Sequence, residues 1–422
     1  MLNGPINRWW TVAAGALGCA GGAGVVATYA LGIFVKSISA EFGWDRSYTT
    51  AGISCFYIVS GLGSLFLGDA ISRWSLRSTT IVFVTLFSLS IMAIGLLPNS
   101  LILFCLVFSV MGFFGSAATA MPYAVAVTHQ FDRNRGLALA LVVSGSGVGA
   151  LLLPGYANEL LQRYGWRVGY FGIGLLVGVV ALLGLVFCLR NPQKDVGAAP
   201  KNVLRLREIY TSGPTFWLIA APLFCISIAL VGLITNLAPI LTDRGASPAE
   251  AASIIGLAGA ASWVSRLGVG LLLDRIHVRY IAAGIFLTAA SGILLFAADA
   301  HGPGLYAAAI CVGLGIGAEA DLLTYSMSRY FAAGSLGRAL GAVWIFWAWG
   351  NGVGVFLGSL SYDLTGDYNS AMLAFAVLSL LSAGLILRLG PYRFPAHQPA
   401  PNGRRKYSTS PDPAPSRTDI HS

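Results

Sequence analysis

Charged side chains are scarce in this sequence. Of its 422 residues, 10% are Asp, Glu, Lys or Arg and 56% are hydrophobic, whereas a soluble domain carries about 25% charged residues. So few charges cannot cover a water-facing surface of this size, which argues against a soluble enzyme. The net charge of +9 would suggest nucleic-acid binding in a soluble protein, but here the basic residues lie between long apolar runs. The composition predicts a protein of the lipid bilayer that binds no nucleic acid.

Cysteine and histidine are also scarce, with six and five copies. The cysteines lie inside apolar stretches without the Cys-x-x-Cys spacing of a metal site, so we interpret them as small buried hydrophobic residues. The histidines lie at the ends of apolar runs, in loops or in the tail, which predicts neither a metal centre nor a histidine proton relay. Gly-x-Gly patterns lack the preceding strand of a nucleotide site. No cofactor is therefore expected.

Twelve charge-poor runs are each long enough to cross a bilayer, which requires about 20 mostly apolar helical residues. They lie at residues 9–34, 48–71, 78–97, 101–128, 136–159, 168–189, 215–241, 250–273, 280–298, 303–328, 339–361 and 369–388. The chain is therefore expected to be an all-α polytopic membrane protein with twelve transmembrane helices.

Lys and Arg are distributed unevenly between the two sides that these spans define. If the N-terminus is cytoplasmic, the cytoplasmic segments hold 20 of the 26 basic residues and the opposite segments hold five. Cytoplasmic loops of membrane proteins carry the excess of basic residues, so both termini are predicted to be cytoplasmic. The remaining basic residue is Arg266, in the middle of the eighth span.

The two halves of the sequence resemble each other. Three pairs of similar positions are separated by 202, 205 and 200 residues: 68–77 and 270–279, 145–149 and 350–354, and Phe131 and Phe331. The common offset predicts two parallel six-helix repeats. The expected divisions are an N-terminal six-helix bundle (1–189), a basic cytoplasmic linker (190–214), a C-terminal six-helix bundle (215–390) and a disordered cytoplasmic tail rich in Pro, Ser and Arg (391–422).

Twelve spans, two pseudo-symmetric six-helix bundles and a Gly-x-x-x-(Asp)-Arg-x-x-x-Arg loop after the second and eighth spans resemble the major facilitator superfamily. The first loop departs from the family pattern at Ser72 and Ser75. Such loops act as gating latches in that family. The resemblance therefore implies a gating role for Arg73, Arg77, Asp274, Arg275 and Arg279.

A narrower resemblance lies around the fourth and fifth spans. Pro122 and the run QFDRNRGLALALVVSGSGVG at 130–149 are similar to the signature of monocarboxylate transporters, with departures at Ala140, Val142 and Ser144. Ser253-Ile-Ile-Gly256 followed by Arg266 is also similar, and that family places its substrate-binding arginine there. The acidic-Gly-aromatic motif at the family's N-terminus is missing. The resemblance implies a secondary transporter of small organic anions.

Arg266 is the most informative single residue. An Arg at the centre of a membrane helix costs about 2.5–3.5 kcal/mol on insertion scales, and it stays charged, so it requires an anionic partner or a water-filled cavity. One interpretation is a guanidinium that binds the substrate carboxylate in a bidentate manner. The other is a structural ion pair with Glu319 or Asp321.

Glu319 and Asp321 lie two residues apart in the tenth span. On a helix they point about 200° away from each other, so at most one is expected to face a central cavity. Either could carry a proton that moves with the anion, and a packing or gating role is the alternative. Ser262 stands where the family often has an acid four residues before the arginine. Proton coupling must therefore use the tenth span or the substrate itself.

Several polar or aromatic residues at mid-span depth are further substrate-binding candidates, each weighed against simple packing. They are Tyr29, Tyr123, Asn236, Tyr325, Trp347 and Asn351. Tyr29 falls where the monocarboxylate family often has a cavity-facing residue of the first span. Trp344, Phe346, Trp347 and Trp349 crowd the eleventh span, which suggests a bulky apolar wall suited to an aromatic or branched acid.

The sequence thus predicts a secondary transporter that moves a small organic anion, with a monocarboxylate as the expected substrate, by alternating access and together with a proton. It is expected to act as a monomer in the inner membrane of a prokaryote. A carboxylate exchanger, an efflux pump for amphipathic compounds and a non-transporting receptor are the alternatives. No nucleophile, base and orienting residue lie at one depth, so an enzyme is not expected.

Overall fold

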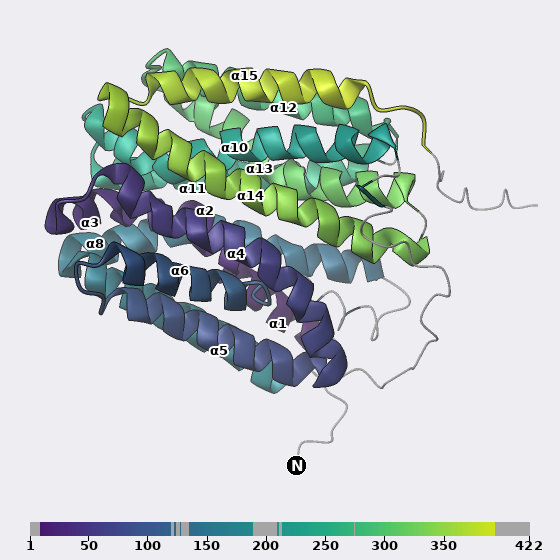
Figure 1. Ribbon diagram of the computed structural model, residues 1–422, viewed down its shortest axis with the longest axis horizontal. Coiled ribbons are helices and arrows are strands. Elements are labelled where there is room, and N and C mark those ends of the chain that lie inside the picture. Colours follow the sequence, from purple (N-terminus) through teal and green to yellow (C-terminus); the bar gives the residue numbers. More distant parts are fainter. Residues whose placement is uncertain are drawn as a thin grey trace, which may run out of the picture.

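The computed structural model describes residues 9–119, 122–123, 127, 135–188, 209–210, 213–273, 275–331 and 333–392. Every regular element in these ranges is a helix, and the long helices run side by side (Figure 1). Within these ranges, nine helical segments have the length and apolar character that a membrane span requires, and α6 is a shorter apolar helix. The all-α polytopic fold expected from the sequence is confirmed.

The N-terminal half contains the following elements: α1 (Trp9–Ala20), α2 (Ala23–Tyr29), the 3-10 helix η1 (Leu31–Phe34), α3 (Val35–Phe42), α4 (Arg46–Arg73), α5 (Leu76–Ile94), α6 (Leu101–Gly115) and α8 (Arg135–Cys188). The first expected span is divided into α1, α2 and η1. At the break between α1 and α2, the Ala23 amide donates to the Ala118 carbonyl at 2.8 Å. The fourth expected span reaches to 128, and most of its part beyond 119 lies outside the described residues.

Helix α8 contains the fifth and sixth expected spans. The chain reverses direction at Gly165, whose φ of 80° and ψ of 172° are non-helical. Glycine populates positive φ without the steric penalty of a Cβ atom. The two spans therefore meet in a tight turn rather than in a loop.

The C-terminal half consists of six long helices: α10 (Pro214–Asp243), α11 (Pro248–Leu273), α12 (Val278–Ala297), α13 (Pro303–Tyr330), α14 (Ala333–Thr365) and α15 (Asn369–Leu387). Proline occupies the first position of α10, α11 and α13, where its missing N–H is not needed. The six helices start and end within a few residues of the expected spans, except for the earlier start of α14.

The internal repeat seen in the sequence corresponds to a repeated helix contact. Gly145 and Gly149 of α8 face the carbonyls of Ala16 and Ala20 on α1, where an added Cβ would lie 1.8 and 2.0 Å from the oxygens. In the second half, 350–354 of α14 packs in the same way on α10, where a Cβ at Gly354 would lie 2.1 Å from the Ile228 carbonyl. Small residues allow helix backbones to approach closely in membranes. The two motifs therefore make equivalent contacts in their own bundles.

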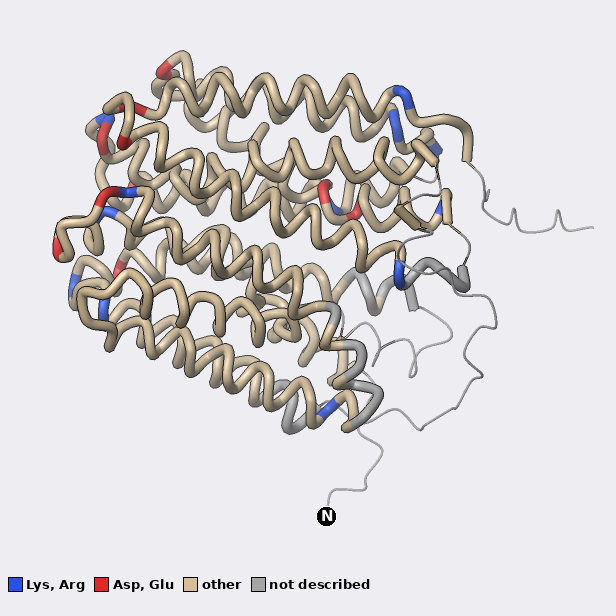
Figure 2. The backbone as a smooth tube through the Cα atoms, in the orientation of Figure 1, with Lys and Arg blue, Asp and Glu red and all other residues tan. Residues whose placement is uncertain are grey.

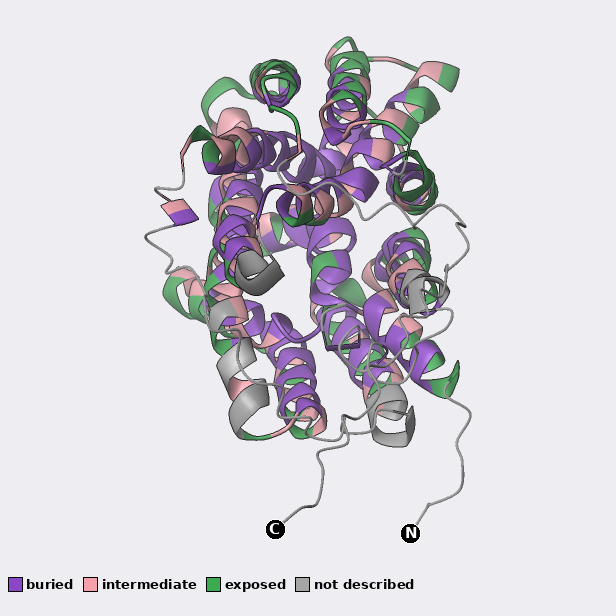
Figure 3. Cartoon of the chain, turned by 90° about the vertical axis from the view of Figure 1, so that its right-hand side faces the viewer, coloured by how far each residue is buried: buried purple, intermediate pink, exposed green. Residues whose placement is uncertain are grey.

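Each bundle has its own internal packing, and two long helix pairs make most of the contacts between the bundles. Helix α1 packs on α8 and α4 on α6, while α10 packs on α14 and α11 on α13. Across the interface α4 contacts α14 and α8 contacts α11. Figure 3 shows the resulting arrangement from one end, with buried surfaces turned inward. The interface between the bundles is thus formed mainly by α4, α8, α11 and α14, and α2 and η1 add contacts to α10.

Charged residues gather at the two ends of the helices, apart from a small group of both signs in the middle of the C-terminal half (Figure 2). We name the two ends by a residue each. The Arg46 end carries the starts of α4 and α11, and the Arg275 end carries the starts of α5 and α12. In the predicted topology, the Arg275 end is the cytoplasmic one. The linker at 190–208 and the tail from 393 lie outside the described residues.

Candidate functional site

Arg266 lies on α11, two turns before the helix ends at Leu273. Its side chain is half-buried, and among the described residues it has no hydrogen bond and no ion pair within 4 Å. It is close enough to interact electrostatically with Tyr29, Glu319 and Asp321. The structural ion pair considered as an alternative for Arg266 is therefore not formed in this conformation. An Arg held among polar groups without a direct partner has the chemistry to receive an anion.

The two acids of α13 have different surroundings, as their spacing predicts. Glu319 is 2% exposed and accepts a hydrogen bond from the Ser227 hydroxyl of α10. Asp321 is half-buried and has no hydrogen-bond or ion-pair partner among the described side chains. Glu319 is thus fixed in the packing between α10 and α13, whereas Asp321 is free to bind a proton or a cationic group.

The N-terminal half contributes polar groups from α2 and α4. Tyr29 of α2 lies beside Ser262 of α11, and its hydroxyl interacts with that side chain without reaching the geometry of a normal hydrogen bond. Thr28 and the fully buried Tyr57 of α4 share a hydrogen bond of 2.7 Å between their hydroxyls. Tyr57 is close enough to Tyr29 and Glu319 to interact electrostatically. The polar groups around Arg266 therefore come from both bundles.

Helix α14 turns one stripe of side chains toward the polar groups around Arg266. Its glycines 350 and 354 face α10, while Ala348 and Gly352 face α4. At 100° per residue, Trp347 and Asn351 lie between these two surfaces, and Trp349 on the opposite side is 39% exposed. Trp347 lies next to Glu319, and its indole Nε1 interacts with that carboxyl without reaching the geometry of a normal hydrogen bond.

Asn351 is fully buried, and neither atom of its amide has a hydrogen-bond partner among the described residues. An unsatisfied buried polar group costs about 1–3 kcal/mol. Asn351 follows Trp347 by one helical turn on the same stripe of α14. We refer to Arg266, Tyr29, Asp321, Trp347 and Asn351 as the central polar cluster.

Three other candidates lie outside this cluster. Asn236 joins α10 to α14: its Nδ2 donates to the carbonyls of Gly232 (2.8 Å) and Val355 (3.2 Å), and its Oδ1 accepts from Ser359 (2.6 Å). All its hydrogen-bonding groups are thus used in packing. The Tyr325 hydroxyl donates to the Leu273 carbonyl at 2.9 Å, at the Arg275 end.

Tyr123 is fully buried against α1, where its hydroxyl lies 1.9 Å from the position that a Cβ on Gly18 would take. It neighbours Cys19, which in turn lies within electrostatic range of Arg266. Tyr123 is therefore one layer away from Arg266.

The residues expected to form gating loops are only partly described. The side chain of Arg73 and all of Asp274 lie outside the described residues, and Arg275 is exposed. Arg77 is half-buried. Arg279 donates to the Leu389 carbonyl at 3.1 Å and thereby ties the start of α12 to the end of α15. The latch role of these residues stays a prediction.

Sequence reasoning missed Thr28, Tyr57 and Ser227. All three lie within apolar helices. A hydroxyl there can either take part in a site or bond to the backbone carbonyl one turn earlier, and the sequence alone does not distinguish the two. Only the packing of α2 against α4, and of α10 against α13, brings their partners into range.

The two bundles are also joined by ions at the Arg46 end. Asp243, the last residue of α10, forms ion pairs with Arg46 of α4 and with Lys36 of α3, the latter at 2.8 Å. Asp363 of α14 accepts hydrogen bonds from the backbone amides of Arg46 (3.1 Å) and Ser47 (2.8 Å). It therefore caps the N-terminus of α4 from the other bundle. We call these five residues the inter-bundle clamp.

Aromatic rings extend the inter-bundle clamp. The Arg46 guanidinium lies 3.6 Å from the centre of the Tyr362 ring and donates to the Tyr368 hydroxyl at 2.9 Å. Its side chain is only 11% exposed. A guanidinium that is desolvated, paired and stacked is held more firmly than a surface ion pair, so the two bundles are closed against each other at this end.

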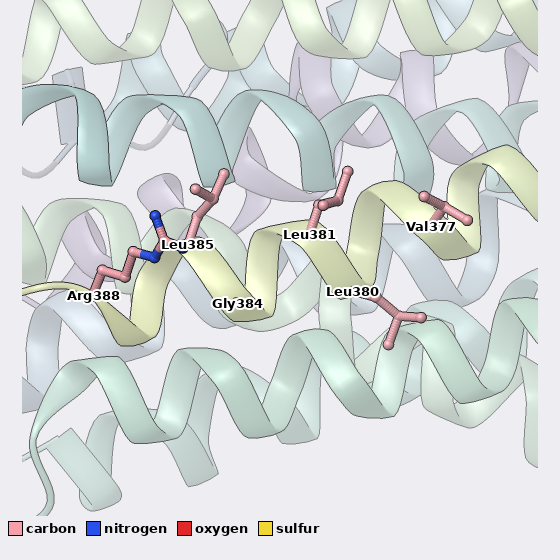
Figure 4. Close-up of a pocket in the computed structure, with 6 residues that line it drawn as sticks. All are labelled: Val377, Leu380, Leu381, Gly384, Leu385 and Arg388. Carbon is pink, nitrogen blue, oxygen red and sulfur yellow. The ribbon is translucent and has the colours of Figure 1, made fainter.

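A surface groove on α15 is unrelated to the central polar cluster (Figure 4). It is lined by Val377, Leu380, Leu381, Gly384, Leu385 and Arg388. Two of its leucines, Leu380 and Leu381, are exposed on the outside of the bundle, where a membrane protein faces lipid. We do not assign it to the site.

The family follows from a comparison of the whole chain. A model of the Major Facilitator Superfamily matches residues 17–355 and 233–417. The chain belongs to the major facilitator superfamily. The fold class expected from the repeat and the spans is thereby confirmed.

Relatives and structural neighbours within the superfamily are transporters. The chain is 25% identical over 376 residues to the uncharacterized MFS-type transporter YcxA of Bacillus subtilis (85% of this chain, 89% of YcxA), and 28% identical over 407 residues to human monocarboxylate transporter 11 (92% and 83%). The crystal structure of a mutant of the nucleoside transporter NupG superposes with a TM-score of 0.74 at 12% identity, covering 90% of this chain and 100% of NupG. The protein is a multi-pass membrane transporter and not an enzyme.

Proposed function

We propose that this protein is a secondary active transporter of small organic anions, most specifically monocarboxylates, and that it works by alternating access between its two bundles. The observation that carries the proposal is Arg266, charged, half-buried and without an ion-pair partner among the described residues, within range of polar groups from both bundles. The similarity to monocarboxylate transporters supports the same substrate class.

Alternating access is supported by the inter-bundle clamp. It holds the bundles together at the Arg46 end, so in this conformation a solute cannot enter between them at that end. Opening toward the other side requires these bonds to break. With the cytoplasmic termini that the distribution of Lys and Arg predicts, and an inner membrane as the proposed location, the described conformation is the one closed to the outside.

A proton moves with the anion in the proposed cycle. Asp321 is the first candidate to carry it, because this half-buried carboxyl has no partner among the described residues and lies within range of Arg266. Glu319 is the second candidate, held by Ser227. The bundles at 1–189 and 215–390, acting within one monomer, provide the two moving parts.

The test is uptake of radiolabelled carboxylates, from lactate to benzoate, into proteoliposomes with and without an inward proton gradient. We expect gradient-driven uptake in the wild type, its loss in Arg266→Ala, and uptake that no longer follows the gradient in Asp321→Asn. Arg163→Ala is the matched control, since Arg163 pairs with Glu159 on an exposed turn of α8.

Two results would point elsewhere. Normal transport by correctly folded Arg266→Ala would exclude the carboxylate site and favour efflux of neutral or amphipathic compounds. Uptake that requires a carboxylate on the opposite side, without any proton flux, would assign the protein as a carboxylate exchanger.

A further inference from the structure

The central polar cluster contains hydrogen-bonding groups that a simple carboxylate cannot use. The Tyr29 hydroxyl is a donor within range of Arg266 and suits an oxygen of a carboxylate, while the Trp347 indole lies next to the Glu319 carboxyl. Asn351 differs from them, because its amide offers both donors and an acceptor. A carboxylate already held by Arg266 has no proton to donate to the Asn351 oxygen. A second polar group is needed to satisfy that amide.

The position of Asn351 separates it from the carboxylate subsite. Trp347 lies next to Glu319, and Asn351 follows one turn later, which places it about 6 Å further along α14 toward the Arg46 end. Gly350, its neighbour, packs against Ser227, whose hydroxyl binds Glu319. The amide therefore belongs to the same interior region as Arg266 but does not share its ligand atoms.

The surface of α14 that precedes Asn351, at Trp347 and the turn before it, is aromatic. Trp344 and Trp347 are in edge-to-face contact, with ring centroids 4.7 Å apart, and lie on the same stripe of α14 as Asn351. A flat apolar body packs well against such rings. A short aliphatic acid would leave both this wall and the amide without contacts.

From this arrangement we infer that the substrate is an aromatic acid with a hydroxyl or carbonyl group on the side of the ring opposite its carboxylate, and that Asn351 binds this second group. The inference rests on the proposed function, because it assumes that Arg266 binds the carboxylate. A hydroxyl satisfies the Asn351 amide best, since it donates to Oδ1 and accepts from Nδ2. Loss of one such buried hydrogen bond lowers affinity by about tenfold.

The inference is tested with two acids that differ only in the second group. Apparent KM values for 4-hydroxybenzoate and benzoate are measured in proteoliposomes, and uptake by Arg266→Ala vesicles is subtracted as leak. We expect the wild type to favour 4-hydroxybenzoate by about tenfold. In Asn351→Leu, which keeps the volume, the ratio of the two apparent KM values should fall to about one.

Two further variants keep the test sound. Asn351→Ser retains a hydroxyl and should show an intermediate preference if the Leu variant fails to fold. Asn158→Leu is the matched control, because Asn158 is a buried asparagine of α8 whose Oδ1 also lacks a partner among the described residues. It lies toward the Arg46 end, outside the central polar cluster, so the ratio should stay at the wild-type value.

The outcomes distinguish this inference from the proposed function. If no acid enters in a manner that depends on Arg266, the proposed function fails and the inference fails with it. If entry depends on Arg266 but the wild type takes up both benzoates equally, or Asn351→Leu keeps the wild-type ratio, only the role of Asn351 is overturned. Uptake of lactate without either benzoate would also overturn it.

Discussion

Replacing Asp243 with Asn should allow the Arg46 end of the transporter to open. Asp243 is the acid of α10 that pairs with both Arg46 and Lys36 of the other bundle. The substitution keeps the shape of the side chain but removes its charge. It therefore weakens contacts that exist only while the bundles are closed at this end, and shifts the equilibrium toward the opposite conformation.

The size of the shift follows from the exposure of the partners. Lys36 is 41% exposed, so its ion pair contributes little, in the range of about 0–1 kcal/mol. Arg46 is 11% exposed and approaches Asp243 with two guanidinium nitrogens, and a hydrogen bond to a charged group contributes about 1.5–3 kcal/mol. A loss of about 2 kcal/mol in total changes the closed-to-open ratio by about 30-fold.

The shift can be measured as a distance between spin labels on exposed positions of the two bundles. Tyr164 of α8 and Leu364 of α14 are 62% and 76% exposed and lie at the Arg46 end. Labels on cysteines at these positions, in a background without the native cysteines, should give one dominant distance in the wild type. In Asp243→Asn a longer distance should appear beside it.

Glu41→Gln is the matched control for this experiment. Glu41 forms an ion pair of 2.7 Å with Arg167 at the same end of the protein, but both residues belong to the N-terminal bundle. The distance distribution of this variant should equal that of the wild type. An unchanged distribution in folded Asp243→Asn would show that the inter-bundle clamp does not determine the conformation.

Two further predictions concern stability. Gly317→Ala should lower the melting temperature in detergent by several degrees, because the new Cβ would lie 2.0 Å from a backbone oxygen of α11 and overpacking costs about 1–3 kcal/mol. Gly268→Ala is the control and should leave the melting temperature nearly unchanged, because a Cβ at Gly268 would have nothing within 4 Å. Equal effects of the two substitutions would refute the contact argument. A hydrogen bond from Arg167, and a smaller contribution from the indole of Trp166, hold the pKa of Glu41 below its ordinary value. The stabilising effect of the Glu41 carboxylate is therefore present above the unfolded pKa of about 4.3 and is lost as the pH falls through the lower folded pKa. The difference in melting temperature between the wild type and Glu41→Gln should be constant from about pH 6 to 8 and should disappear below about pH 4.

The helices could be predicted from the sequence because bilayer thickness fixes the length of an apolar run. The ends of α10 to α13 follow from charges, prolines and run length. The division of the first span at Gly21 and Gly22 could not be predicted in this way, since it depends on the contact between Ala23 and Ala118. The tight turn at 165 likewise depends on a single glycine with positive φ.

The site could be predicted only in part. Arg266, Glu319 and Asp321 can be identified from the sequence because a charge inside a span is costly wherever it lies. Tyr29, Trp347 and Asn351 lie near them, whereas Asn236 is used in packing and Tyr325 lies at the Arg275 end. A polar residue in an apolar helix carries no information on which way it faces until the neighbouring helices are known.

The inter-bundle clamp illustrates the same limit. Asp243 and Asp363 each lie at the end of a span and would be expected to lie in water at a helix terminus. Their partners, Lys36 and the first turn of α4, are more than 190 residues away in the sequence. Pairing between residues of two separate repeats cannot be derived from either repeat alone.

In the proposed transport cycle, the charges of Arg266, Glu319 and Asp321 would link anion binding to a proton. Arg266 supplies one positive charge, while Glu319 and Asp321 can supply two negative charges and a bound carboxylate adds a third. In an interior of low dielectric, three negative charges around one guanidinium are strongly unfavourable, so binding of the anion favours protonation of an acid. By reciprocity, protonation favours binding of the anion to the same degree. Because the Glu319 carboxyl already accepts a hydrogen bond from Ser227, the proton is expected on Asp321. For this reason we assign gradient dependence to Asp321 and substrate binding to Arg266.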